Sequence, residues 1–270
     1  MVAAAPIDPS LRIASVRLAV SDLARSAAFY EHALGLHVLR REDERALLGA
    51  DPDHPALELV SIANPVPLVP RSTGLFHVAW LHPTRAALAE TVRRIAATRW
   101  PLEGASDHGV SEALYLSDPD GLGIEIYADR PRESWESGEG GRGVRMFTAP
   151  LDLDDLLAQG LAHPAPQIAY GTGIGHVHLK VADVASAESF YRDQLGFQEM
   201  ALLPPSAAFL SAGGYHHHIG LNSWQSAGGS APPENAPGLR EVSFTLDGAE
   251  PRTLTDPDGN SLSFASAPAR

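Results

Sequence analysis

A stretch near the N-terminus recurs in the second half of the chain and decides the fold. Residues 13–36 read IASVRLAVSDLARSAAFYEHALGL, and residues 174–197 read IGHVHLKVADVASAESFYRDQLGF. Matching residues, such as Tyr30 and Tyr191, stay 161 positions apart along the whole stretch (191 − 30 = 161). A constant offset of this kind indicates an internal duplication.

Each copy predicts a strand followed by a short helix and further strands. Apolar residues alternate over 16–20 and over 177–181, which is typical of a half-buried strand. Asp22 and Asp183 stand where they can cap the helix that follows. The remaining strands are expected at 46–48 and 57–62 in the first copy, and at 208–210 and 216–221 in the second.

A second pair of modules follows the first pair. Residues 74–80 (GLFHVAW) and 238–244 (GLREVSF) look like matching first strands. The turn sequence Asp-Pro-Asp-Gly opens both 118–127 and 256–264, and each of these stretches continues as a strand. In the first copy, the intervening residues include a predicted helix at 84–98. The second copy has no room for one, so the last module is expected to lack its helix.

Composition excludes several classes of function. The 270 residues carry a formal net charge of −13, which disfavours nucleic acid and anionic membrane surfaces as partners. The chain contains no cysteine, so any metal must be held by His, Asp or Glu. Residues 1–10 contain no basic residue and no apolar run, and a cytoplasmic location is expected.

The paired motifs resemble those of the vicinal oxygen chelate superfamily, which contains glyoxalases, bleomycin resistance proteins and extradiol dioxygenases. The sequences ALYLSDPDG and SAGGYHHHIGLN are similar to those of its catechol-2,3-dioxygenase-like branch. The resemblance implies an α+β fold in which tandem βαβββ modules form two half-open mixed β-barrels. Two domains are expected, at 10–130 and 172–266, joined by a linker at 131–171 with a short helix at Leu151–Gln159.

The resemblance also implies an iron site built from two histidines and one carboxylate, a ligand set that leaves coordination positions open. Neither half of this chain supplies that set alone. An arginine stays protonated and cannot bind a cation, and an uncharged serine is a poor ligand. At the three ligand positions the first half offers Arg17, His77 and Glu125, and the second half offers His178, Glu241 and Ser263.

Combining the halves completes the set. Module two supplies His77 and Glu125, and module three supplies His178. Alternation along their strands places the three side chains off the packed faces. We therefore predict that module two pairs with module three, and that the remaining three residues mark a site that has lapsed. His176 is expected to be an exposed strand residue.

Three further residues are implied to act on the substrate. His217 takes the place of the family's acid–base histidine, while His216 and His218 are expected to project to the opposite face of a strand. His108 and Tyr115 are implied to contact the bound substrate, although the spacing between them is shorter than in better-known members.

The resulting hypothesis is an extradiol dioxygenase that cleaves a catechol, a small aromatic diol, with O2. Fe(II) is the expected metal, and Mn(II) would fit the same ligands. Two alternatives remain open at this point: a glyoxalase-like, metal-dependent isomerase or lyase, and a non-catalytic small-molecule binding protein of the resistance type. Association into a homo-oligomer is also left open.

Overall fold

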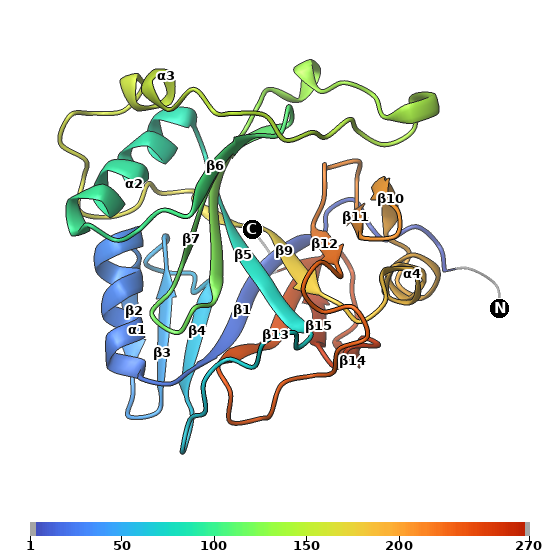
Figure 1. Cartoon of the computed structure of the whole chain (residues 1–270), viewed down its shortest axis with the longest axis horizontal. Helices are drawn as coiled ribbons and strands as arrows, with labels where there is room; N and C mark the ends of the chain where they lie inside the picture. The colour runs from blue at the N-terminus through green and yellow to red at the C-terminus, as the bar shows by residue number, and fades with distance from the viewer. Residues whose placement is uncertain (1–3, 268–270) are drawn as a thin grey trace.

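The structure, a computed structural model, describes residues 4–267 and contains two mixed β-sheets (Figure 1). The larger sheet has eight strands in the order β10-β11-β12-β9-β5-β8-β7-β6. It combines module two with module three. Module two contributes β5 (Gly74–His82), β6 (Gly104–Asp107), β7 (Ser111–Ser117) and β8 (Gly123–Asp129), and module three contributes β9 (Gly173–Lys180), β10 (Gln198–Leu203), β11 (Ala207–Ser211) and β12 (Ile219–Asn222).

The second sheet has seven strands in the order β14-β15-β13-β1-β4-β3-β2, and it combines module one with module four. Module one contributes β1 (Arg12–Val20), β2 (His37–Arg41), β3 (Arg45–Gly49) and β4 (Leu57–Ser61), and module four contributes β13 (Gly238–Leu246), β14 (Arg252–Thr255) and β15 (Ser261–Ser266).

In both sheets, an antiparallel pair of central strands joins the two halves of the sequence. β5 pairs with β9 in the larger sheet, and β1 pairs with β13 in the smaller one. The predicted pairing of module two with module three is therefore confirmed, as is the α+β fold of tandem modules. The stretches 10–130 and 172–266 each give one module to each sheet, so the two halves are interleaved in space.

The helices confirm the predicted modules. The helices α1 (Leu23–Phe29) and α4 (Val184–Ser189) are capped by Asp22 and Asp183, whose carboxylates accept from backbone N–H groups at 3.0 and 2.7 Å. Among the described residues no helix lies between β13 and β14, as expected for the last module, and none is long and apolar enough to cross a membrane. The other helical segments are η1 (Tyr30–Leu34), α2 (Arg85–Thr98), η2 (Arg132–Ser134), η3 (Glu139–Gly141), α3 (Leu153–Ala158) and η4 (Phe190–Gln194).

The two repeated motifs contact each other within each half. The hydroxyl of Tyr30 donates to Asp118 at 3.3 Å, and the hydroxyl of Tyr191 donates to Asp256 at 2.9 Å. All four side chains are buried. Each tyrosine thus links the helix of one module to the Asp-Pro-Asp-Gly turn of the next. Sheets join modules across the halves, and these contacts join modules within a half, so the four modules interlock.

Candidate metal centre

Three neighbouring strands of the larger sheet bring two histidines and a glutamate together. β5 lies between β8 and β9, and Ala79 of β5 pairs with Glu125 on one side and with His176 on the other. His77 lies two residues from Ala79 and projects on the same face of β5. Since the alanine side chain is only a methyl group, the space between Glu125 and His176 stays open to the ring of His77.

The nitrogen and oxygen atoms of this group are spaced as metal ligands are. Glu125 Oε2 lies 3.0 Å from His77 Nε2 and 3.3 Å from His176 Nε2. His77 Nε2 is buried and makes no hydrogen bond, although the carboxylate is so close. Two ligands at right angles, each about 2.1 Å from a cation, would be about 3 Å apart. The donor set therefore fits a divalent metal, which would satisfy the orphaned nitrogen.

The surroundings of Glu125 and His176 hold both side chains in the protonation state that binds metal. Burial tends to raise the pKa of Glu125, but His176 and His77 outweigh it and hold that pKa well below its ordinary value. Burial lowers the pKa of His176 to about 4, against the opposing effect of Glu125. At neutral pH the carboxylate is charged and the imidazole of His176 is neutral, as metal binding requires.

His178 lies beside this group rather than in it. Its side chain is buried on the same face of β9 as His176, and its Nε2 also lacks a hydrogen-bond partner. Three aromatic rings surround it, with centroid distances of 5.2 Å to Phe76 and 5.7 Å to both Phe209 and Trp224. The described residues whose ligand atoms lie within 4.8 Å of one another include His77, Glu125 and His176, and not His178.

Our expectation of an exposed His176 is wrong, because the residue is only 2% exposed. Alternation along the strand could not separate His176 from His178, since both point to the same face. The strand register decides between them, because it places His176 level with Glu125. A signal in the sequence was available: His176-Val177 matches His77-Val78 more closely than His178-Leu179 does.

The three consecutive histidines lie in an irregular segment between β11 and β12 and not at the start of a strand. β12 begins only at Ile219, so the strand predicted over 216–221 is wrong at its N-terminal end. His216 and His217 are both buried and contact each other, with 2.8 Å between their Nδ1 atoms. The expectation that His216 turns to the opposite face from His217 is therefore wrong. His218 is buried too, and its Nδ1 lies 3.0 Å from the hydroxyl of Ser211.

A hydrogen-bonded chain fixes the tautomer of His217. His216 Nε2 lies 3.0 Å from Asp129, and since a carboxylate only accepts, this nitrogen donates. In a neutral ring His216 Nδ1 then accepts from Nδ1 of His217, which leaves Nε2 of His217 unprotonated. Burial, with neighbouring His176 and His216, holds the pKa of His217 well below its ordinary value. Its ring lies 4.0 Å from that of His176, centroid to centroid. Sequence reasoning missed Asp129.

His108 and Tyr115 are hydrogen-bonded to each other in spite of their short spacing. His108 Nδ1 lies 2.8 Å from the backbone carbonyl of Phe147 and must donate to it. Nε2 of His108 therefore accepts from the hydroxyl of Tyr115, at 2.5 Å. Burial, together with the charge of Glu125, raises the pKa of Tyr115, so its hydroxyl keeps the proton.

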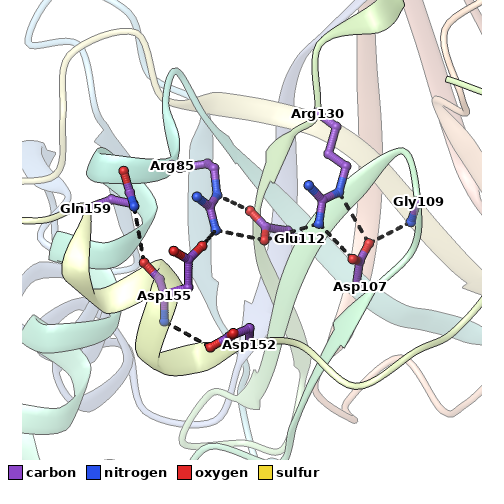
Figure 2. A network of polar contacts seen from close by, with 8 residues as sticks. All are labelled: Arg85, Asp107, Gly109, Glu112, Arg130, Asp152, Asp155 and Gln159. Atoms are coloured by element: carbon purple, nitrogen blue, oxygen red, sulfur yellow. Dashed lines mark hydrogen bonds and ion pairs between the residues drawn. The ribbon is translucent and has the colours of Figure 1, made fainter. Parts of the chain in front are cut away.

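Ion pairs outside the cavity hold the turn that carries His108. Figure 2 shows that Arg130 reaches both Asp107, at 2.7 Å, and Glu112, at 3.3 Å. Glu112 is also paired with Arg85. Asp107 and Glu112 lie at the ends of the adjacent strands β6 and β7, so the network ties together the two strands that flank His108. The arginines in it are already neutralised by carboxylates.

One cavity of about 380 Å3 unites these groups. It is lined by all six residues predicted from the sequence and by His176 as well. The predicted residues are His77, His108, Tyr115, Glu125, His178 and His217.

The corresponding positions in the seven-stranded sheet hold an ion pair. Arg17 Nε lies 2.7 Å from Glu58 and its Nη1 lies 3.4 Å from Glu241. Ser263 donates to the other oxygen of Glu241 at 3.0 Å. Within residues 4–267, the His, Asp and Glu groups that could hold a metal all lie around the cavity of the eight-stranded sheet.

Several known proteins are similar to this chain in sequence. The profile of the Glyoxalase/Bleomycin resistance protein/Dioxygenase superfamily matches residues 12–126 and 173–250. Catechol-2,3-dioxygenase from Bacillus subtilis is 44% identical over 244 residues, which cover 89% of this chain and 84% of that protein. Biphenyl-2,3-diol 1,2-dioxygenase 3 from Rhodococcus globerulus is 28% identical over 128 residues, covering 46% of this chain and 67% of that protein.

Solved structures share the fold at much lower identity. Glyoxalase I from Zea mays superimposes with a TM-score of 0.57 at 18% identity, over 95% of this chain and 92% of that chain. This structural similarity supports the fold alone, whereas the sequence matches also support the family and the type of enzyme. The chain belongs to the Glyoxalase/Bleomycin resistance protein/Dioxygenase superfamily and is an oxidoreductase of its dioxygenase branch.

Proposed function

We propose that the protein cleaves the ring of a catechol next to its two hydroxyl groups, using O2 and a divalent metal held by His77, Glu125 and His176. Fe(II) is the proposed metal, and Mn(II) fits the same ligands. The observation that carries the proposal is the buried group of two histidines and one carboxylate at the wall of a cavity. The 44% identity to a catechol-2,3-dioxygenase supports the choice of reaction.

A metal with this ligand set, when bound, would supply open positions for substrate and the redox chemistry that O2 needs. The side chains around it manage protons. His217 has an unprotonated Nε2, so it can accept a proton from a catechol hydroxyl and return it later to the opened product. Asp129 and His216 hold its ring in that tautomer through their hydrogen bonds.

Tyr115 and His108 contribute on the opposite side of the cavity. Because the Tyr115 hydroxyl donates to His108, its oxygen has lone pairs free to accept a hydrogen bond from a bound hydroxyl group. Rotation of the same hydroxyl would let it donate to a developing negative charge instead. The carbonyl of Phe147 fixes the His108 ring throughout.

The test is reconstitution without air. The purified protein is stripped of metal, loaded with Fe(II) or Mn(II), and mixed with catechol and O2, and the yellow ring-fission product is followed by its absorbance. The Glu125→Gln variant should lose bound metal and product. Glu241→Gln is the control, because Glu241 is a glutamate at another of the corresponding ligand positions in the other sheet, that of His77, and the change should leave both unchanged. If neither metal gives product with catechol or a substituted catechol, the proposal is wrong.

A further inference from the structure

The wall of the cavity contains no cation to receive an acidic substituent. Among the described residues, neither lysine nor arginine lines it. In this part of the chain, Glu125 is the one acidic residue of the lining. The chain as a whole carries a net charge of −13. A carboxylate on the substrate would therefore be buried without a partner, which costs free energy.

Two arginines that neighbour residues of the cavity wall have other partners. Arg130 is paired with Asp107 and Glu112 (Figure 2). Arg145 is paired with Glu136 at 2.5 Å and lies over the ring of Phe147, 5.8 Å from its centroid. Neither side chain lines the cavity.

Large apolar side chains gather instead where the cavity meets solvent. Phe147, Leu203 and Trp224 all line it, yet they remain 42%, 54% and 53% exposed. They come from three separate parts of the chain: the connector, the end of β10, and the segment after β12. Single exposed apolar residues are common on protein surfaces, but exposed apolar residues that come together from distant segments often mark a ligand-binding surface.

Aromatic rings continue this surface inward from the opening. Phe76 lies 5.5 Å from Trp224, edge to face, and 5.2 Å from His178. Phe209 lies 5.0 Å from His217. An apolar wall thus leads from Trp224 to the histidines. Pockets of about 300–1000 Å3 hold drug-sized ligands, so a cavity of about 380 Å3 offers more room than one catechol ring fills.

From this geometry we infer that the substrate is a catechol with a neutral, apolar alkyl or aryl substituent, which lies against Phe147, Leu203 and Trp224, and that carboxylated catechols are discriminated against. The inference rests on the proposed ring cleavage for the orientation of the diol. The identity of the substituent comes from the opening, which takes no part in the metal group.

The test compares 3-phenylcatechol with 3,4-dihydroxybenzoate, with unsubstituted catechol as reference. On the metal-loaded enzyme, kcat/KM for 3-phenylcatechol should exceed that for 3,4-dihydroxybenzoate by at least about 100-fold, since one ligand buries apolar area and the other an unpaired charge. Calorimetric titration of the metal-free protein gives a second readout, and 3-phenylcatechol should bind more tightly there as well.

Two variants of neighbouring residues locate the effect. Leu203→Lys removes an apolar contact and adds a cation at the opening. It should lower the ratio of kcat/KM for 3-phenylcatechol to kcat/KM for 3,4-dihydroxybenzoate about tenfold. Leu202→Lys is the matched control, because Leu202 is 42% exposed but does not line the cavity, and it should leave the preference unchanged.

The outcomes separate this inference from the proposed function. Cleavage of unsubstituted catechol together with equal or better use of 3,4-dihydroxybenzoate overturns the inference alone. Absence of cleavage with every catechol overturns the proposed function, and the calorimetric comparison then still decides the inference. Equal affinities, no binding of 3-phenylcatechol, or identical effects of Leu203→Lys and Leu202→Lys all count against it.

Discussion

Removal of His176 should weaken metal binding about 100-fold, whereas removal of His178 should leave the affinity for metal nearly unchanged. The two residues lie on one face of β9, and both are buried. Only His176 is level with Glu125, and its Nε2 lies 3.3 Å from that carboxylate. His176→Ala would therefore reduce the three proposed protein ligands to two, while His178→Ala removes an aromatic residue of the cavity wall.

The size of the effect follows from linkage between metal binding and folding. At a metal concentration 100 times the dissociation constant, binding stabilises the wild-type protein by about 2.7 kcal/mol. For a chain of this length each kcal/mol raises the melting temperature by about 2–4 °C, so metal should raise it by about 5–10 °C. Loss of an outer partner of a metal ligand already weakens binding by about 10- to 100-fold, and loss of a ligand should do at least as much.

A 100-fold weaker site at the same metal concentration is half occupied. The stabilisation is then RT ln 2, about 0.4 kcal/mol, and the melting temperature rises by about 1 °C. The assay is thermal unfolding of wild type, His176→Ala and His178→Ala, each with and without Mn(II) under anaerobic conditions. Because each variant is compared with itself, its own change in stability cancels. A shift retained by His176→Ala and lost by His178→Ala would refute the assignment drawn from the strand register.

Three other changes test separate parts of the structure. Asp129→Asn no longer enforces the tautomer of His217 and should lower kcat about 10- to 100-fold with little change in metal affinity; an unchanged kcat would contradict the hydrogen-bonded chain. Tyr191→Phe leaves the buried Asp256 without one donor and should lower the free energy of unfolding by about 1–2 kcal/mol, measured in urea, while the metal-induced shift persists. Burial lowers the pKa of His82 to about 4, so between about pH 6.5 and 4 the unfolded chain binds a proton that the folded chain does not. Stability of the metal-free protein should therefore fall as pH falls through this range, by up to about 1.4 kcal/mol per pH unit for this residue, and His82→Gln should flatten the slope.

The sequence predicts those features that short motifs encode. Asp22 and Asp183 predict the helices that they cap, and the Asp-Pro-Asp-Gly turns predict the strands that follow them. Both predictions are possible because capping and turn formation depend on residues a few positions apart. The pairing of modules across the halves was predictable for another reason. Only the pairing of module two with module three supplies two histidines together with Glu125. The chemistry of metal ligands therefore selected the pairing, which secondary-structure propensity could not do.

Alternation of apolar and polar residues could not predict the strand register or the end of a strand. Which of His176 and His178 stands level with Glu125 depends on how β9 aligns with β5, and a shift by two residues keeps every side chain on the same face. The alternation of apolar and polar residues along the strand does not reveal such a shift. The hydrogen bonds that connect Asp129 with His217 through His216 could not be predicted either, since they join the end of β8 to an irregular segment almost ninety positions later.

The two sheets show why one duplicated scaffold can hold a reactive site on one side and a stable one on the other. In the larger sheet two histidines leave the charge of Glu125 incompletely balanced, and a divalent cation would complete it. In the smaller sheet the guanidinium of Arg17 lies between Glu58 and Glu241 and supplies the balancing charge from within the chain. A cation built into the protein cannot exchange or open a position to a ligand. The same arrangement of strands is therefore a candidate for catalysis where the cation must come from solution, and a structural contact where an arginine replaces it.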